Sequence, residues 1–403
     1  MLTGLCVLIL GGAAGCKKKD DALDFDRPLP PGAYALRRLV DPEMFPDLAA
    51  GCPTDDVSRS LLVTAIDRSL DYLAHPSSET YYPLQGITHA QAVDSLMAFR
   101  SLLLAVQPPQ ELAQQILDRF DVYQSVGCDD RGAVLFTGYY TPIFEGSLEP
   151  TGQYRYPLYR LPSDLVKNGE GLCIGRRLDD GRVVPYPARR ELETSGQLAG
   201  LELVYLKDKF DAYICHVQGS ARFRLPDGRE FEVGYAGKNA GEYQSVGRLL
   251  LADEKIKPEE YSLDAIRRYF REHPGEVDPY CQQNESFIFF QESSGGPFGS
   301  LGAPVTPYRS LATDKSVFPR GCLTYVDTTV PVREGPHLIG RPFRAFMLDQ
   351  DTGGAIRAAG RADIYLGIGD EAGRIAGWTA GVGKLYYLFL KAGAAEPGAA
   401  PLP

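Results

Sequence analysis

The amino-acid sequence predicts a mainly β protein of two parts with flanking helices. Three observations predict this class: helical periodicity early in the chain, strand patterns that a second helical stretch interrupts, and short strands with Gly and Pro turns before the C-terminus. With 403 residues, the chain has room for two or three domains, or for one domain inserted into another. No internal repeat of fixed period is visible in the sequence.

Apolar residues at helical spacing predict three helices in the N-terminal part. The first stripe runs from Leu62 to Leu73 and the second from Leu96 to Val106. The third follows the Pro108-Pro109 pair and runs from Leu112 to Phe120. Prolines at this position are typical of a helix start.

Strand patterns begin near residue 133 and return after residue 286. The clearest hairpin is RFRLPDGREFEV (222–233), in which apolar and charged residues alternate around an Asp227-Gly228 turn. Helical patterns lie between the two strand regions, at 242–251 and at 262–272, and Ser262 opens the second of them.

The N-terminus predicts export and lipid anchoring. An apolar run from Leu5 to Leu10 is too short to span a bilayer and is typical of a signal peptide. Small residues then lead to Cys16, as in bacterial lipoprotein signals, although the start carries no basic residue. We expect a signal peptide over 1–16, acylation of Cys16, an acidic and Pro-rich linker over 17–32, and a disordered tail over 393–403. The mature protein is then tethered to a membrane without spanning it.

Composition excludes several classes of partner and cofactor. The net charge is −10 and no Lys/Arg-rich stripe is present, which argues against nucleic acid. No Cys pair has C-x-x-C spacing and the five histidines are scattered, so we expect no metal site. GYAGKN and GIGDEAG lack the spacing of phosphate or dinucleotide loops, so no cofactor is expected. Disulfides and buried free thiols both remain open for six cysteines: Cys52, Cys128, Cys173, Cys215, Cys281 and Cys322.

The triplet Asp351-Thr352-Gly353 carries the catalytic aspartate in pepsin-like and retroviral proteases. Such an enzyme needs two aspartates that share one proton, each from its own triplet. This chain has one copy, and Asp327-Thr328-Thr329 lacks the glycine. The sequence therefore disfavours an aspartic protease.

Three aspartates, Asp314, Asp351 and Asp363, each stand beside small residues at the end of a predicted strand. A carboxyl group held near others, or buried in a groove, has its pKa raised and can act as a general acid. This pattern predicts carboxylate-based catalysis on an uncharged bond, with a glycosidic bond as the leading choice.

Seven stretches resemble the membrane-bound lytic transglycosylase A family of bacterial murein-cleaving enzymes. They run in family order over roughly residues 130–390. The stretches are FTGYYTPIFEGS (136–147), YPLYRLP (156–162), DAYICHVQGSARFRLPDG (211–228), VGYAGKNAGEYQSVGRLL (233–250), NESFIFF (284–290), TPYRSLATDKSVFPRG (306–321) and LDQDTGGAIRAAGRADIYLGIGDEAGRIAG (348–377).

The resemblance implies a double-psi β-barrel domain formed from both ends of the chain, 33–140 with 284–392. A second β-domain, 141–283, would be inserted between these ends, with a groove separating the two. Pepsin-like lobes have a related psi-loop arrangement, so an Asp-Thr-Gly triplet can recur without a shared reaction.

The resemblance also implies a lyase, a peptidoglycan lytic exotransglycosylase. It would cleave the β-1,4 bond between N-acetylmuramic acid and N-acetylglucosamine without water and leave 1,6-anhydromuramyl ends. The family's acid, which then acts as base, falls on Asp363; Asp351 would tune and orient it, and Asp314 would be structural. Action within a strand or from its end stays open.

The groove residues implied by the resemblance are Thr137, Gly138, Tyr139, Tyr140, Gln218, Gly219, Lys238, Asn239 and Tyr365. Strand alternation puts only one of Tyr139 and Tyr140 in the groove and leaves open which. The implied partner is the peptidoglycan glycan strand, and the implied location is the periplasmic face of the outer membrane, as a monomer. Two rivals remain: a hydrolytic glycosidase that uses Asp351 on water, and a non-catalytic peptidoglycan-binding lipoprotein.

Overall fold

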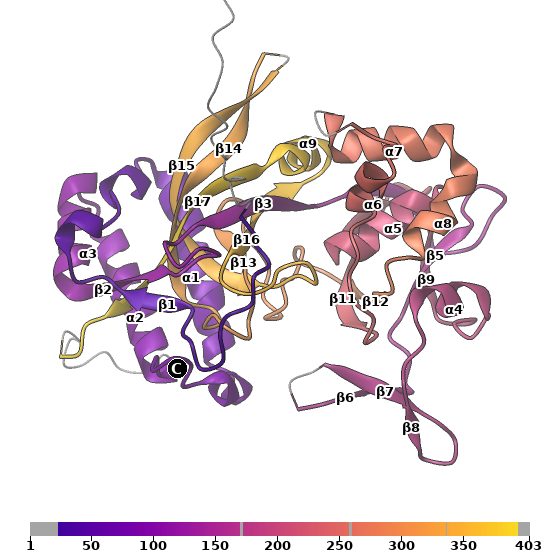
Figure 1. Ribbon diagram of the computed structural model, residues 1–403, viewed down its shortest axis with the longest axis horizontal. Coiled ribbons are helices and arrows are strands. Elements are labelled where there is room, and N and C mark those ends of the chain that lie inside the picture. The colour runs from indigo at the N-terminus through magenta and orange to yellow at the C-terminus, as the bar shows by residue number, and fades with distance from the viewer. Residues whose placement is uncertain (1–22, 170–171, 258–259, 336, 394–403) are drawn as a thin grey trace, which may run out of the picture.

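The computed structural model describes residues 23–393 except for 170–171, 258–259 and 336 (Figure 1). The predicted signal peptide with Cys16 and nearly all of the predicted C-terminal tail lie outside these residues. Among the described residues, no helix is both long and apolar enough to cross a membrane. Residues 23–32, predicted as part of a linker, contact the body of the protein, since Arg27 forms an ion pair of 2.7 Å with Asp130.

The first part of the molecule is a barrel. Its sheet has the strand order β1-β2-β17-β14-β15-β13-β16-β3, and β17 also pairs with β3, which closes six of the eight strands. Strand pairs β13–β15 and β3–β16 are parallel. The strands are Leu36–Arg38 (β1), Phe120–Ser125 (β2), Val134–Thr141 (β3), Ser310–Ala312 (β13), Leu323–Glu334 (β14), His337–Asp351 (β15), Arg361–Ile368 (β16) and Ala380–Leu390 (β17). This closed barrel confirms the predicted fold class.

Three helices cover the barrel (Figure 1) and confirm the three predicted stripes: α1 (Asp56–Leu73), α2 (His89–Leu104) and α3 (Pro109–Arg119). Side-chain caps open the first two, because Asp55 accepts a hydrogen bond from the Ser58 amide and Thr88 from the Gln91 amide. The stripes pack inward, and the Phe99 ring lies 4.8 Å from that of Phe346. Short 3₁₀ helices are Pro42–Met44, Ala49–Gly51, Pro76–Tyr81 and Pro274–Glu276.

The second part is built on a six-stranded sheet with the order β12-β11-β10-β4-β9-β5. Its strands are Ile143–Ser147 (β4), Tyr156–Tyr159 (β5), Glu202–Leu206 (β9), Ala221–Arg224 (β10), Glu230–Lys238 (β11) and Ile288–Ser293 (β12). A three-stranded sheet projects from it, made of Leu165–Lys167 (β6), Cys173–Arg177 (β7) and Val183–Val184 (β8) (Figure 1). The predicted assignment of 284–392 to the barrel part is wrong for β12, because this strand pairs with β11.

The predicted hairpin is confirmed as β10–β11, with Phe223 opposite Phe231. Helix α7 (Leu263–Glu272) starts as predicted, where Ser262 accepts a hydrogen bond from the Ala265 amide. Helix α6 (Val246–Ala252) starts later than the predicted 242. The remaining helices are Arg189–Thr194 (α4), Lys209–Gln218 (α5), Val277–Cys281 (α8) and Asp370–Trp378 (α9).

The sequence analysis expected strands where α5 and α9 lie. Helix α5 is rich in aromatic and β-branched residues, which favour strands, but its face packs in the core of the second part. Helix α9 is short and contains glycines. Gly373 is needed there, because a Cβ at this position would lie 2.7 Å from the Tyr140 ring. Tertiary contacts, and not local sequence preference, therefore make both segments helical.

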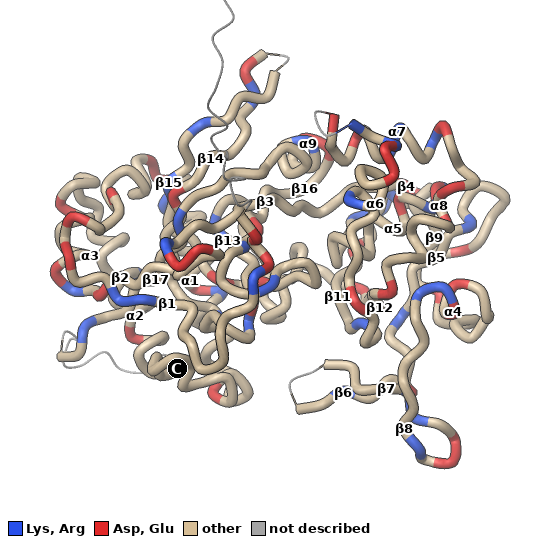
Figure 2. The backbone as a smooth tube through the Cα atoms, in the orientation of Figure 1, with Lys and Arg blue, Asp and Glu red and all other residues tan. Residues whose placement is uncertain are grey.

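Charges are mixed over both parts. Figure 2 shows Lys and Arg interspersed with Asp and Glu along the backbone of the barrel and of the second part. Most ion pairs among the described residues are exposed, so each contributes little to stability.

All six cysteines within the described residues are free thiols. Burial raises the pKa of the Cys52 and Cys322 thiols to about 12. Because the thiolate is the reactive form, we expect both to react with iodoacetamide at least about a hundredfold more slowly in the folded than in the unfolded protein. Peptide mapping after labelling at one pH, with and without denaturant, measures this ratio. Equal labelling in the two states would contradict the burial of these thiols.

Candidate active site

Four neighbouring strands, β15, β13, β16 and β3, bring the predicted site residues together. Ala312 in β13 pairs with Asp351 on one side and Asp363 on the other. Asp363 in turn pairs with Thr137 in β3. The Cα atoms of the two aspartates are therefore about 10 Å apart, which is twice the spacing of paired strands.

Asp363 holds one oxygen in place and leaves the other free. The Thr137 hydroxyl donates a hydrogen bond to Oδ1, and the Arg361 Nε atom lies 3.7 Å from the same oxygen. No described residue donates a hydrogen bond to Oδ2. The Asp363 side chain keeps 17% of its surface exposed, so an approaching substrate can reach it.

Asp351 is fixed by the backbone. Its Oδ1 accepts hydrogen bonds from the amides of Ser300 at 2.7 Å and Thr352 at 2.8 Å. Burial raises the pKa of the Asp351 carboxyl above its ordinary value, while these hydrogen bonds act in the opposite direction. One strand, β13, therefore separates Asp351 from Asp363. The Asp351 carboxyl group is held by backbone amides and titrates at a higher pH than a free aspartate.

Asp314 uses both oxygens to fix loops. Oδ1 accepts from the Ser316 amide at 3.0 Å and Oδ2 from the Ala358 amide at 2.7 Å. These bonds link Asp314 to two backbone segments, and its structural role stays a prediction. Within the part of the chain that the structure describes, no group of three or more His, Cys, Asp or Glu side chains could hold a metal ion.

The structure answers which tyrosine faces the aspartates. Burial, and then the charges of Asp351 and Asp363, raise the pKa of Tyr139. Its hydroxyl is buried beside the Asp351 carboxyl group. Tyr140 points to the opposite side, where it is buried against Gly373 of α9.

Three predicted groove residues have structural roles instead. A Cβ at Gly138 would lie 2.5 Å from the Leu366 side chain, so glycine is required where β3 meets its neighbours. Gly219 ends α5 in the left-handed conformation, with φ of +74°. Tyr365 is buried, and its hydroxyl lies 3.0 Å from the Thr141 hydroxyl. The prediction that Tyr365 stacks on a sugar is wrong for this structure, because its ring has almost no exposed surface.

Asn239 contradicts its prediction as well. Its side chain is fully buried, and its amide nitrogen donates to the carbonyls of Pro187 and Glu285, each at 2.9 Å. Its Oδ1 accepts from the Phe287 amide at 2.8 Å. With every polar atom engaged inside the second part, Asn239 has none left for a glycan.

Gln218 and Lys238 both lie at the boundary between the barrel part and the second part. Gln218 Oε1 accepts a hydrogen bond of 3.2 Å from the Tyr140 amide, which joins the second part to β3. Lys238 is half-buried at the end of β11. Burial lowers the pKa of Lys238, and the positive charge of Arg357 in the barrel part lowers it further. Both side chains therefore lie where the two parts meet.

Tyr243 is a site residue that the sequence analysis missed. An ideal Cβ built on Gly354 would lie 3.5 Å from the Tyr243 Cβ, so the loop after Asp351 touches this residue of the second part. Burial mainly raises the pKa of Tyr243, and the charge of Asp363 adds to it. Tyr243 lies inside VGYAGKNAGEYQSVGRLL (233–250), so membership of that stretch was the available signal.

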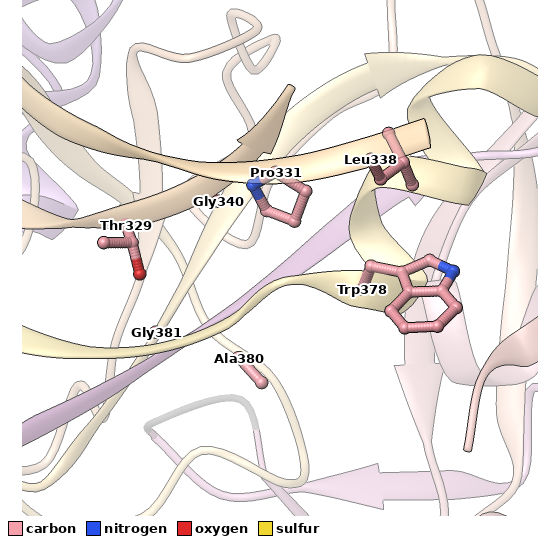
Figure 3. Close-up of a pocket in the computed structure, with 7 residues that line it drawn as sticks. All are labelled: Thr329, Pro331, Leu338, Gly340, Trp378, Ala380 and Gly381. Carbon is pink, nitrogen blue, oxygen red and sulfur yellow. The ribbon is translucent and has the colours of Figure 1, made fainter. Parts of the chain in front are cut away.

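A separate hollow of about 160 Å³ lies between the outer ends of β14 and β15 and the end of α9 (Figure 3). The antiparallel pair β14–β15 forms one wall of it, through Thr329, Pro331, Leu338 and Gly340. Trp378, which is 53% exposed, forms another wall. The hollow contains none of the three aspartates, so it is distinct from the candidate active site.

Comparison with known proteins identifies two family regions. Residues 135–291 match the MltA specific insert domain, and residues 309–389 match the 3D domain. The membrane-bound lytic murein transglycosylase A of Escherichia coli K12 is 33% identical over 277 residues, which cover 68% of this chain and 70% of the relative. The Vibrio cholerae protein of the same name is 33% identical over 271 residues, 66% of this chain and 68% of the relative.

Solved structures share the whole architecture. A membrane-bound lytic murein transglycosylase from Agrobacterium tumefaciens has a TM-score of 0.72 at 28% identity, covering 89% of this chain and 98% of that one. Escherichia coli MltA with bound chitohexaose has a TM-score of 0.67 at 27% identity, covering 91% and 99%. The barrel, the two matched regions and these relatives together show that the chain belongs to the membrane-bound lytic murein transglycosylase A family.

Proposed function

We propose that the protein is a lytic transglycosylase, a lyase that cleaves the β-1,4 bond between N-acetylmuramic acid and N-acetylglucosamine in peptidoglycan. The names of its relatives support the reaction class. The chitohexaose in the Escherichia coli structure supports a glycan strand as the ligand. We also propose export and a lipid anchor at Cys16, in line with the membrane-bound relatives.

One observation carries the choice of Asp363 as the acid. Of the three predicted aspartates, Asp314 uses both oxygens, and Asp351 uses Oδ1 twice, to hold backbone amides. Among the described residues, no backbone amide donates to the Asp363 carboxyl group, whose Oδ1 accepts only from the Thr137 hydroxyl. A general acid must reach the departing oxygen directly, so a carboxyl group that no backbone amide holds in place favours Asp363.

The first step is protonation of the leaving group. Asp363 Oδ2 gives its proton to the glycosidic oxygen as the bond from that oxygen to C1 of the muramyl ring breaks. Thr137 and Arg361 hold Oδ1 and keep the carboxyl plane fixed during this transfer. The negative charge left on the carboxylate then faces the oxocarbenium-like sugar and stabilises it.

The second step closes a ring. Asp363, now a carboxylate, takes the proton of the muramyl 6-hydroxyl while that oxygen forms a bond to C1. This step gives the 1,6-anhydro end and returns Asp363 to its acid form. No water is consumed, because the nucleophile is already part of the sugar. Tyr139 and Tyr243, whose pKa values the Asp363 charge raises, would orient the strand at the acid, and Gln218 and Lys238 would bind it farther along the groove.

Asp351→Asn separates this account from the hydrolase rival. We expect kcat/KM to fall about tenfold to a hundredfold, and transglycosylase products to persist, because Asp351 tunes the site without transferring the proton. Since burial raises the pKa of Asp351, its charge appears at higher pH than in a free aspartate. The pH profile of kcat/KM should lose that ionisation, since Asn does not titrate. Complete loss of turnover would instead favour Asp351 as the group that activates water.

The test of the reaction class compares two readouts on purified murein. A lytic transglycosylase solubilises murein without creating new reducing ends, whereas a hydrolase creates one for each bond cut. We expect clearance of turbidity with no rise in borohydride-reducible ends. A matched rise in reducing ends would mean hydrolysis, and no clearance with retained murein binding would mean a non-catalytic protein.

A further inference from the structure

A small hairpin lies in the segment that returns from the second part to the barrel. The chain enters the second part after β3 and comes back between β12 and β13, through residues 294–309. Within this segment, residues 297–305 fold back on themselves, and the Val305 amide donates a hydrogen bond of 2.8 Å to the Pro297 carbonyl. We call residues 297–305 the crossing hairpin, because the segment that contains them connects the two parts.

The two ends of the crossing hairpin are anchored to different parts of the molecule. Just before the hairpin, the Gly296 amide donates to Oε2 of Glu232 on β11, at 3.4 Å. At its other end, Arg68 on α1 donates to the Val305 carbonyl at 3.3 Å and to the Thr306 hydroxyl at 2.7 Å. The crossing hairpin is therefore held between the second part and a helix that covers the barrel.

The tip of the crossing hairpin lies against Asp351. The Ser300 amide donates to Asp351 Oδ1 at 2.7 Å, although the two residues are 51 positions apart in the chain. The other amide at this oxygen belongs to the adjacent residue, Thr352. A Cβ at Gly299 would lie 2.7 Å from the Gln350 carbonyl oxygen and 3.2 Å from Asp351 Cγ. Gly299 is therefore needed for the backbone to come close enough to reach the carboxyl group.

A hydrogen bond from an amide stabilises the charged form of a carboxyl group. Burial raises the pKa of Asp351, and the Ser300 amide is the first of the groups that oppose this rise. The titratable groups that face Asp351 are Tyr139 from β3, Tyr365 from β16 and Lys315 from the loop after β13. Moving the crossing hairpin would therefore change the ionisation of Asp351 without replacing any titratable side chain.

We infer that the crossing hairpin is a positioning element of the active site, in which the Ser300 amide holds the Asp351 carboxyl group and Gly299 allows that approach. This inference rests on the proposed function, which gives Asp351 its role beside the acid Asp363. Ser300 and Gly299 act on the reaction through Asp351, so they are positioning residues. Because the hairpin is anchored to both parts, the same bond ties the orientation of Asp351 to the placement of the second part.

The first test uses the intact full chain and needs no activity. Aspartate labelled with carbon-13 at Cγ reports the titration of each carboxyl group by NMR, and the signal missing from Asp351→Asn belongs to Asp351. Serine labelled with nitrogen-15 reports the Ser300 amide, which is identified by its absence from Ser300→Ala. We expect the Ser300 amide proton to shift with the same pH midpoint as the Asp351 carboxyl carbon. An amide proton that does not follow this titration would overturn the inference.

Two substitutions remove the bond in different ways. Ser300→Pro deletes the amide hydrogen, and Gly299→Ala pushes the hairpin away from the Gln350 carbonyl. Each should raise the midpoint of Asp351 by about one pH unit, because the carboxylate loses a hydrogen bond. Ser300→Ala keeps the amide, so Asp351 should titrate in it as in the parent protein. An equal shift in Ser300→Ala, or no shift in Ser300→Pro and Gly299→Ala, would show that the amide does not hold Asp351.

Murein turnover then tests the consequence for the reaction. Gly299→Ala should lower turnover about tenfold and move the Asp351 ionisation in the pH profile upward, in step with the NMR midpoint. In the Asp351→Asn background it should add less than about a twofold loss, because no titrating carboxyl group remains to be held. The matched control is Gly275→Ala, at an exposed glycine where an added Cβ would meet no atom within 4 Å, and it should keep the parent rate.

Thermal unfolding shows whether each variant is folded. A loss of turnover in Gly299→Ala without a shifted pH profile, or an equal loss in the Asp351→Asn background, would mean that the hairpin acts through packing and not through Asp351. If the parent protein cleaved no murein while the NMR titrations behaved as expected, the proposed function would fail and the hold of Ser300 on Asp351 would stand.

Discussion

Replacing Asp363 with Asn is expected to lower murein turnover at least about a thousandfold, because one group supplies both proton transfers. Asn has the shape of Asp and can still accept the hydrogen bond from Thr137, so the barrel and the glycan affinity should remain. Initial rates of murein clearance, together with chitohexaose binding and the unfolding midpoint, measure the three quantities separately.

The matched control is Asp180→Asn, which removes the same charge from an exposed ion pair with Arg182 near β8. This variant should keep the parent rate. If Asp363→Asn retained more than about a tenth of the activity, general acid catalysis by Asp363 would be untenable.

Lys315→Met is expected to cost about 3–5 kcal/mol of the free energy of unfolding. Lys315 forms a buried ion pair with Asp349, whose side chain is fully buried in the barrel. Asp349 also accepts hydrogen bonds of 2.8 Å from Tyr387 and from Thr313. Removing the ammonium leaves a carboxylate in the core without a counter-ion, which is costly even with these two bonds.

The free energy of unfolding of Lys315→Met should depend on pH. Burial raises the pKa of Asp349 and Lys315 opposes the rise, so Lys315→Met raises the pKa further. An acid whose pKa is higher in the folded state gives stability below its unfolded pKa and loses it as pH rises through the folded pKa. The deficit of the variant should therefore be smallest near about pH 4 and largest near about pH 8.

A second substitution checks the cause. Lys315→Met combined with Asp349→Asn removes both charges, and we expect it to recover most of the loss at neutral pH. Denaturant titrations at both pH values measure all three variants. A deficit that is equal at the two pH values, or that Asp349→Asn does not relieve, would mean that the loss comes from packing and not from charge.

The parts of the fold that local patterns govern were predictable from the sequence. The stripe from Leu62 to Leu73 became α1, and the Asp227-Gly228 turn became the β10–β11 hairpin, because apolar periodicity and turn chemistry act within a few residues. Resemblance to a known family predicted Asp363 and Thr137 as site residues. The parallel pairing of β16 with β3 brings these two residues side by side.

The parts that depend on distant contacts were not predictable. Asn239 reads as a polar groove residue, yet Pro187 and Glu285 engage it inside the second part. Alternation could not choose between Tyr139 and Tyr140, since the choice depends on α9, whose Gly373 leaves room for the Tyr140 ring. Tyr243 meets the loop after Asp351 only because the second part folds against the barrel, and no local sequence pattern encodes that contact.

The chemistry of the products shows whether the glycan is cleaved without water, with Asp363 as acid and then base. Purified murein is digested by the protein in water enriched in oxygen-18, and the soluble fragments are analysed by mass spectrometry. The account predicts 1,6-anhydromuramyl ends, each one water lighter than a hydrolysis product and free of the heavy isotope. Reducing ends that carry one heavy oxygen would contradict it and would make Asp351, acting on water, the group to test next.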